Sequence, residues 1–311
     1  MHPAYSVIFF TAASGAGYGL LGLMGMLNAG GYLPSDKWFG LTGFFLALGL
    51  ITFGLLASTF HLGHPERAWR ALTQWRSSWL SREGVLAVLT YMPAGLFAIG
   101  WVFLDQTAGI FMVMGVLSAI GAALTVYCTS MIYASLKSIP AWTNELVSPL
   151  YMVLGLATGG LILDVLLHIF DTPIAGVSVL CILALITGAL LKRRYWQEID
   201  AAPRETDLAS ATGLGQIGKV RVLDNPHTSK NYLQQEMGYR VARKHALKLR
   251  RIATVALFIL PIILLGLALA FPAIALAATV LAVVAACVGI VTERWLFFAE
   301  AKHVVMTYYE G

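Results

Sequence analysis

The chain has 311 residues, of which 58% are hydrophobic and only 12% are charged, and its mean hydropathy is +0.75. A soluble globular domain has about a quarter of its residues charged, so this composition indicates an integral membrane protein. It excludes water-soluble enzymes, disordered chains and nucleic-acid binders.

Eight apolar segments, taken in chain order, are each long enough to cross about 30 Å of hydrocarbon as an α-helix. They lie at 5–28, 38–60, 84–104, 108–134, 147–169, 174–191, 252–271 and 273–292. We therefore predict one all-α domain, residues 1–311, built as a bundle of eight transmembrane helices. The first segment has no basic region before it and is too long for a cleavable signal peptide, so it should stay in the mature chain.

Basic residues are distributed very unevenly between the two sides of such a bundle. Because eight helices alternate in direction, both termini and the connections after the second, fourth and sixth helices share one side, which holds 20 of the 21 Lys and Arg residues. Only Lys37 lies opposite. Cytoplasmic loops are enriched in Lys and Arg, so we predict that both termini and the long connection 192–251 are cytoplasmic. Tryptophans near or beyond the helix ends are typical of interfacial aromatic belts: Trp38, Trp69, Trp75, Trp79, Trp101, Trp142, Trp196 and Trp295.

The connection between the second and third helices carries the first cluster of reactive side chains. His61 lies in the segment 61–67 at the end of the second helix, and Glu83 lies where the third helix begins. A histidine can hydrogen-bond a small carbonyl, and a carboxylate can carry a proton, so the pair would suit a quinone at the membrane edge. An equally weighted alternative is structural, with His61 capping its helix and Glu83 paired to Arg82 or Arg67.

Two further polar groups lie near helix ends. The segment 292–295, with Glu293 and Arg294, follows the last apolar run and could extend the same site or face an extrinsic partner, whereas Glu300 and Lys302 are expected to be solvated. On the other side of the membrane, Asp164 and His168 are one helical turn apart. We interpret them as an interfacial hydrogen-bonded pair rather than a proton pathway.

The connection 192–251 is the one region with soluble character. Its GxGxxG pattern at 213–218 follows a polar run rather than a strand, and the run after it, 219–223, is typical of a strand rather than of a helix. A dinucleotide site needs the opposite order, a strand before the pattern and a helix after it. We therefore reject a nucleotide site and interpret the pattern as a flexible loop. The basic stretch 234–251 could contact lipid headgroups or an acidic protein.

Metal ligands are not arranged in any pattern typical of a metal centre. Cys128, Cys181 and Cys287 each lie alone in an apolar run, as small buried hydrophobes do, and the histidines all lie at helix ends or in loops. A haem held by two histidines inside the bundle is therefore not expected, nor is an iron–sulfur cluster, and any metal centre should belong to another chain. A transporter is a remote alternative.

Several short motifs together resemble the dimethyl sulfoxide reductase anchor-subunit family. The motifs are His61-Leu62-Gly63 with Pro65 and Arg67-Ala68, Leu80-Ser81 with Glu83, Tyr133, Ile139-Pro140-Ala141-Trp142, Glu293 with Arg294, and Phe297-Phe298. The resemblance implies a haem-free anchor in a bacterial inner membrane that binds ubiquinone or menaquinone. It also implies two partners, a molybdopterin catalytic subunit and a ferredoxin-like subunit with four iron–sulfur clusters.

The resemblance further implies roles for individual residues. Quinone binding and proton transfer would fall to His61 and Glu83, with Arg67, Tyr133 and Arg294 as additional candidates. The basic insertion 192–251 and the ERWLFFAEAKH ending are more similar to the sulfite:quinone oxidoreductase branch. A cytoplasmic site favours the same branch, because dimethyl sulfoxide and polysulfide relatives, which would oxidise quinol, resemble complexes that face the periplasm.

Overall fold

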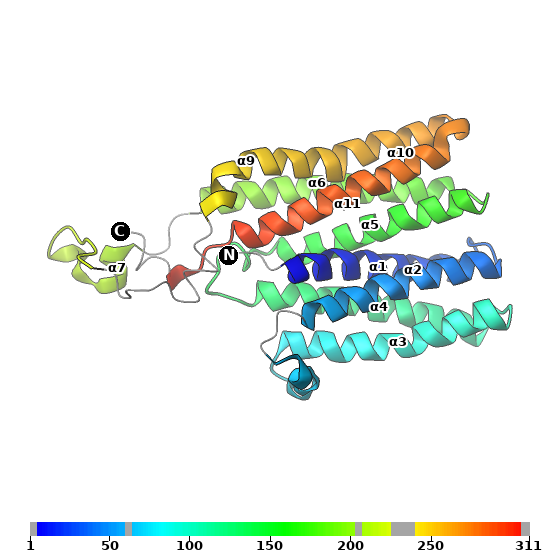
Figure 1. The fold of residues 1–311 in the computed structure, drawn as a ribbon, viewed down its shortest axis with the longest axis horizontal. Coiled ribbons are helices and arrows are strands. Elements are labelled where there is room, and N and C mark those ends of the chain that lie inside the picture. The colour runs from blue at the N-terminus through cyan, green and yellow to red at the C-terminus, as the bar shows by residue number, and fades with distance from the viewer. Residues whose placement is uncertain (1–4, 60–63, 203–206, 225–239, 306–311) are drawn as a thin grey trace.

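The computed structural model describes residues 5–59, 64–202, 207–224 and 240–305, with the side chains of 240–244 left aside. Within these ranges the regular structure is helical (Figure 1). The elements are α1 (Tyr5–Ala29), α2 (Lys37–Thr59), the 3₁₀ helix η1 (Pro65–Gln74), α3 (Trp79–Phe103), α4 (Ile110–Ala134), α5 (Val147–Ile169), α6 (Ala175–Ala201), α7 (Leu208–Thr212), η2 (Leu214–Gln216), α9 (Arg240–Thr254), the π-helical turn η3 (Val255–Ile259), α10 (Leu260–Ala270), η4 (Pro272–Ile274) and α11 (Ala275–Ala299).

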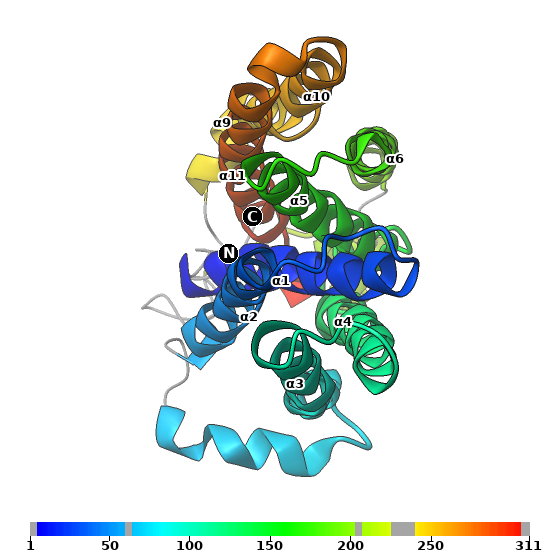
Figure 2. The ribbon, with the colours of Figure 1, turned by 90° about the vertical axis from the view of Figure 1, so that its right-hand side faces the viewer.

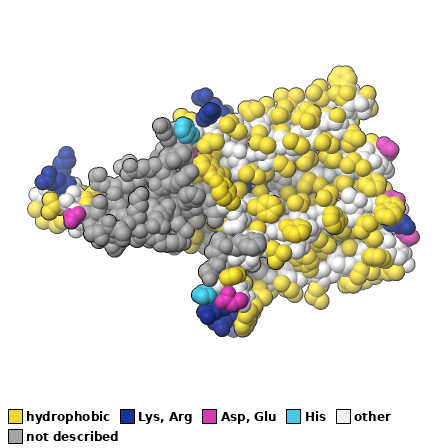
Figure 3. Space-filling model, in the orientation of Figure 1, with side chains coloured by type: hydrophobic (Ala, Val, Ile, Leu, Met, Phe, Trp, Pro, Cys, Tyr) yellow, Lys and Arg dark blue, Asp and Glu magenta, His cyan; other side chains and the backbone are white. Residues whose placement is uncertain are grey.

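Eight helices of the described chain are long and apolar enough to cross a membrane, which confirms the predicted number. They run side by side, with α1 in the middle between α2, α4 and α5, α3 outside α2 and α4, and α6, α9, α10 and α11 beyond α5 (Figures 1 and 2). Hydrophobic side chains cover the flank of the bundle, and charged ones gather at its two ends (Figure 3). The chain is therefore a multi-pass membrane protein. We call the end at which α1 begins and α11 finishes the terminal end.

Glycines allow α1 to lie at the centre of this packing. A Cβ atom at Gly19 would overlap the backbone carbonyl of Gly155 on α5, and one at Gly25 would overlap the carbonyl of Gly115 on α4. At Gly17 it would lie 2.7 Å from the carbonyl oxygen of Ala47 on α2. Small residues let helix backbones approach closely in lipid, where van der Waals packing rather than the hydrophobic effect drives helix association. The glycines of α1 thus explain why three neighbours can pack against it.

Several helices extend further at the terminal end than the sequence predicted. α3 begins at Trp79 instead of residue 84, α6 continues to Ala201 instead of residue 191, and α11 continues to Ala299 instead of residue 292. Each prediction ended its helix at a charged side chain. Those side chains are buried and have partners inside the bundle, so the helices continue past them.

Some tryptophans and one cysteine also differ from expectation. Trp38, Trp69 and Trp75 are exposed, as an interfacial belt requires, but Trp101 and Trp142 are buried. Their indole N–H groups donate to backbone carbonyls of Asp36 and Phe297, each at 3.0 Å, which removes the cost of burying them. Contrary to prediction, Cys287 is exposed on the flank of the bundle, although Cys128 and Cys181 are buried.

The residues that follow the GxGxxG segment, 219–223, form no strand, again contrary to prediction. Within the GxGxxG segment, Gly213 ends the preceding helix α7 with a positive φ of 69°, a conformation that favours glycine, and η2 covers Leu214–Gln216. Asp207 caps α7, and its hydrogen bonds from Ser210 lower the pKa of that carboxyl.

Candidate functional site

Glu83 lies inside the bundle rather than at its surface. It belongs to the second turn of α3, is 3% exposed, and accepts a hydrogen bond from the hydroxyl of Thr129 on α4. The predicted alternative, in which Glu83 pairs with Arg82 or Arg67, is wrong. Arg82 donates to the backbone carbonyls of Trp75 and Arg76 at 2.9 and 2.7 Å, and among the described residues Glu83 forms no ion pair.

Three charged residues, Lys192 on α6 with Glu293 and Arg294 on α11, form a second buried group, which we call the ion triad. Glu293 accepts from the ammonium group of Lys192, and its other carboxylate oxygen lies 2.8 Å from Nε of Arg294. All three residues are at most 2% exposed. The triad carries two positive charges against one negative charge, which would stabilise a neighbouring oxygen that gains negative charge.

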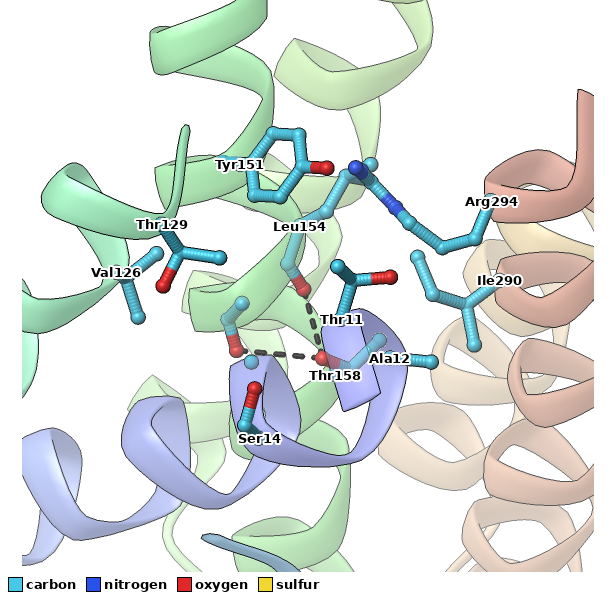
Figure 4. Close-up of a pocket in the computed structure, with 12 residues that line it drawn as sticks. Thr11, Ala12, Ser14, Val126, Thr129, Tyr151, Leu154, Thr158, Ile290 and Arg294 are labelled. Atoms are coloured by element: carbon cyan, nitrogen blue, oxygen red, sulfur yellow. Dashed lines mark hydrogen bonds between the residues drawn. The ribbon is translucent and has the colours of Figure 1, made fainter. Parts of the chain in front are cut away.

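The guanidinium of Arg294 faces a small polar cavity between α1, α4, α5 and α11 (Figure 4). The polar residues that line it are Thr11, Ser14, Thr129, Tyr151, Thr158 and Arg294. Its volume is about 10 Å³, which is close to the space that one water molecule needs. Because Thr129 lines the cavity and also bonds Glu83, the cavity joins Glu83 to the ion triad.

Two donors at this cavity have no hydrogen-bond partner among the described residues. They are Nη1 of Arg294 and the hydroxyl of Tyr151, which lie next to each other and interact without forming a well-aligned hydrogen bond, and the guanidinium is 4.0 Å from the centre of the Tyr151 ring. The hydroxyls of Ser14 and Thr158, in contrast, donate to carbonyls of their own helices. Buried donors are rarely left unpaired, so the pair indicates a site for an acceptor oxygen of a water or ligand.

Tyr133 supports this cavity without lining it. Its ring stacks on that of Tyr151 with 6.0 Å between centroids, and it contacts Trp142 and both phenylalanines of the Phe297-Phe298 pair. Motifs that are far apart in the sequence therefore pack as one aromatic cluster. This cluster holds Tyr151 in place.

The structure thus brings together Glu83, Tyr133 and Arg294 of the predicted site residues. His61 lies outside the described residues. Arg67 is not brought to the cavity: it lies on η1, outside the bundle beyond α3 (Figure 2), with its side chain 57% exposed and its Nε 3.6 Å from Glu66.

Sequence reasoning missed Thr129, Tyr151 and Lys192. A threonine and a tyrosine inside apolar runs carry no local signal, and Lys192 directly follows an apolar run, where a loop residue is expected. It also assigned Glu300 wrongly to solvent. The Glu300 side chain is 11% exposed and accepts from Nε of Arg250 at 2.9 Å, and its burial raises its pKa despite that arginine. Lys302 is exposed, as predicted.

Asp164 and His168 form the predicted hydrogen-bonded pair at the opposite end of the bundle. Nδ1 of His168 lies 2.8 Å from the backbone carbonyl of Asp164 and 3.8 Å from its carboxylate, which accepts from Ser178 on α6. No group of three or more potential metal ligands occurs in the part of the chain that the structure describes.

Comparison with known proteins identifies the family of the chain. The family described as DMSO reductase anchor subunit (DmsC) matches residues 1–299. The chain is 31% identical to the C subunit of sulfite dehydrogenase from Allochromatium vinosum over 329 aligned positions, which cover 100% of this chain and 99% of that protein. It is 28% identical to the C component of anaerobic dimethyl sulfoxide reductase from Haemophilus influenzae over 156 positions, which cover 46% of this chain and 55% of that protein. The chain belongs to the DMSO reductase anchor-subunit family, as the motifs indicated.

Proposed function

We propose that this member of the anchor-subunit family passes electrons from an iron–sulfur partner to membrane quinone, as part of a molybdopterin sulfite:quinone oxidoreductase. The observation that carries the proposal is the cavity where Thr129, which is hydrogen-bonded to Glu83, lies with the two unpaired donors of Arg294 and Tyr151. The full-length similarity to a sulfite dehydrogenase subunit supports sulfite as the electron donor. A dimethyl sulfoxide or polysulfide reductase type of anchor, which oxidises quinol, is the alternative.

The residues at the cavity fit a quinone carbonyl. A bound quinone supplies an acceptor of two electrons and two protons. Nη1 of Arg294 and the hydroxyl of Tyr151 would donate to one carbonyl oxygen and hold it in the cavity, and the net positive charge of the ion triad would favour reduction. Thr129 would pass a proton between the cavity and Glu83, which lies toward the terminal end and would exchange that proton with solvent.

His61 keeps its proposed role as a hydrogen-bond partner and proton donor to a quinone carbonyl, although it lies outside the described residues. In the sequence it stands two positions after the last residue of α2 and 22 positions before Glu83. For Arg67 we propose no quinone contact, because its exposed position on η1 separates it from the cavity.

The proposed orientation places the terminal end, and with it both partners, on the cytoplasmic side. Its support is the distribution of 20 of 21 basic residues, together with the start of α1 and the end of α11 at one end of the bundle (Figure 1). A green fluorescent protein fused to the C-terminus should fluoresce and an alkaline phosphatase fusion should be inactive. The reverse pattern would refute the orientation.

Glu83→Gln and Thr129→Val test the function in the purified complex. Both replacements keep the side-chain shape and remove the proton carrier or its hydroxyl link. We expect sulfite oxidation with quinone to fall by about 10² or more, while sulfite oxidation with a soluble artificial acceptor is unchanged, since the partner subunits remain intact.

His61→Ala should show the same split between the two acceptors. Asp105→Asn, at the opposite end of the bundle, is the matched control and should keep both activities. Quinone-linked turnover of Glu83→Gln within about threefold of wild type would contradict the proposal. Electron flow only from quinol to dimethyl sulfoxide or polysulfide would favour the alternative type of anchor.

A further inference from the structure

An apolar groove opens on the flank of the bundle between α1, α4 and α5. Its volume is about 330 Å³, whereas the polar cavity has about 10 Å³. Ligand sites for small molecules have about 300–1,000 Å³, so the groove, unlike the cavity, can hold a ring and part of a tail. The residues that surround its outer part, Gly22, Met26, Ile120, Ala123 and Leu156, are apolar. Met26, Ile120 and Ala123 are exposed where the bilayer would lie, so an occupant can enter from lipid.

The inner end of the groove adjoins the polar cavity. Val126 on α4 and Gly155 on α5 line both spaces. Tyr18 on α1 also lines the groove; it is 2% exposed, and its hydroxyl completes no hydrogen bond within the described chain, although it lies beside Thr125. The groove therefore runs from the lipid-facing flank to one unpaired buried donor, and it shares two lining residues with the cavity that holds the others.

The glycines of α1 near the cavity and the groove differ in whether a neighbouring helix packs against them. Gly19 packs directly against Gly155, but a Cβ atom at Gly15 or at Gly22 would meet no other atom within 4 Å. Gly15 lines the cavity and Gly22 lines the groove. Helix packing does not require glycine at these two positions, and the missing side chains leave space for an occupant.

We propose that the groove binds the ring and the first tail units of an isoprenoid quinone, which enters sideways from the lipid with its polar head toward the cavity. This inference rests on the proposed function. An apolar path that ends in unpaired hydrogen-bond donors suits a molecule with a hydrocarbon tail and carbonyl oxygens at its head. A phospholipid acyl chain would fill the groove but would satisfy none of these donors.

Gly22→Leu in the purified complex tests the groove. The leucine side chain would project into its outer part, where the tail lies. We expect the KM for a long-tailed quinone to rise by about tenfold or more, because the tail loses its apolar contacts. The KM for a quinone without a tail should stay within about twofold, since that ring does not need the outer groove. Gly266→Leu on α10, where a Cβ also meets nothing within 4 Å, is the matched control and should change neither value.

Photoaffinity labelling measures where the quinone binds, independently of turnover. An azido-derivative of a long-tailed quinone should label peptides of α1 and α4 in the wild type, and Gly22→Leu should weaken that labelling. Labelling of other helices, together with unchanged KM values in Gly22→Leu, would overturn the groove and leave the proposed function intact. Co-purified phospholipid that long-tailed quinone does not displace from the groove would also overturn it. Failure of the wild type to reduce any quinone would instead overturn the proposed function.

Discussion

Glu293→Gln should strongly destabilise the protein, because it removes the only negative charge of the ion triad. Lys192 and Arg294, at most 2% exposed, would then be two buried cations without their common partner. Removing one partner of a buried ion pair costs about 3–5 kcal/mol, since an uncompensated charge stays out of water. For a protein of this size that corresponds to a loss of about 5–10 °C in Tm.

Lys192→Met provides the comparison, because it leaves Glu293 and Arg294 as a balanced pair. The lost ammonium contacts, including the one 4.3 Å above the Tyr195 ring, should cost clearly less than the loss of Glu293. Both variants and the wild type should be measured by tryptophan fluorescence during heating, in the same detergent. A Tm of Glu293→Gln equal to or above that of Lys192→Met would refute this account of the triad.

Two further predictions concern packing and pH. Gly19→Ala should lower the Tm by several degrees, because its Cβ would overlap the Gly155 carbonyl and overpacking costs about 1–3 kcal/mol. Gly22→Ala, whose Cβ would meet no neighbouring atom, should leave the Tm unchanged. Equal thermal stability of the two variants would contradict the close contact between α1 and α5. Burial raises the pKa of Glu300 in the folded protein above its value in the unfolded chain, which is about 4.3. This carboxyl therefore contributes most to stability below about pH 4.3, where it is protonated. That contribution is lost as the pH rises through the folded pKa. The Tm of Glu300→Gln relative to wild type should therefore increase between about pH 4 and 7, and a decrease over that range would show that the pair with Arg250 outweighs burial.

The eight helices could be predicted because crossing lipid imposes a length of about 20 apolar residues, a property that can be counted along the sequence. The family could be recognised for a related reason. Its motifs are short and local, and the match of the family to residues 1–299 confirmed the family that they indicated.

The ends of three helices could not be predicted in this way. A charged residue after an apolar run normally indicates a loop, and Lys192 and Glu293 were assigned accordingly. They lie inside helices because each satisfies the other across the bundle, 101 positions apart in the sequence. Only the tertiary arrangement of the bundle, which lets Lys192 of α6 reach Glu293 of α11, creates that partner.

Some residues of the candidate site could likewise be identified from the sequence, and others only from the structure. Its strongly polar members, Glu83 and Arg294, were identified from residue type and position, since an ionisable group at membrane depth is costly without a task or a partner. Thr129 and Tyr151 were not, because such residues are also common as plain bundle residues. They became recognisable only when α4 and α5 placed one hydroxyl against Glu83 and the other beside Arg294. The sequence by itself therefore determined the membrane architecture and the family, while tertiary packing decided which hydroxyls contact the charged groups of the candidate site and where a cavity and groove remain open.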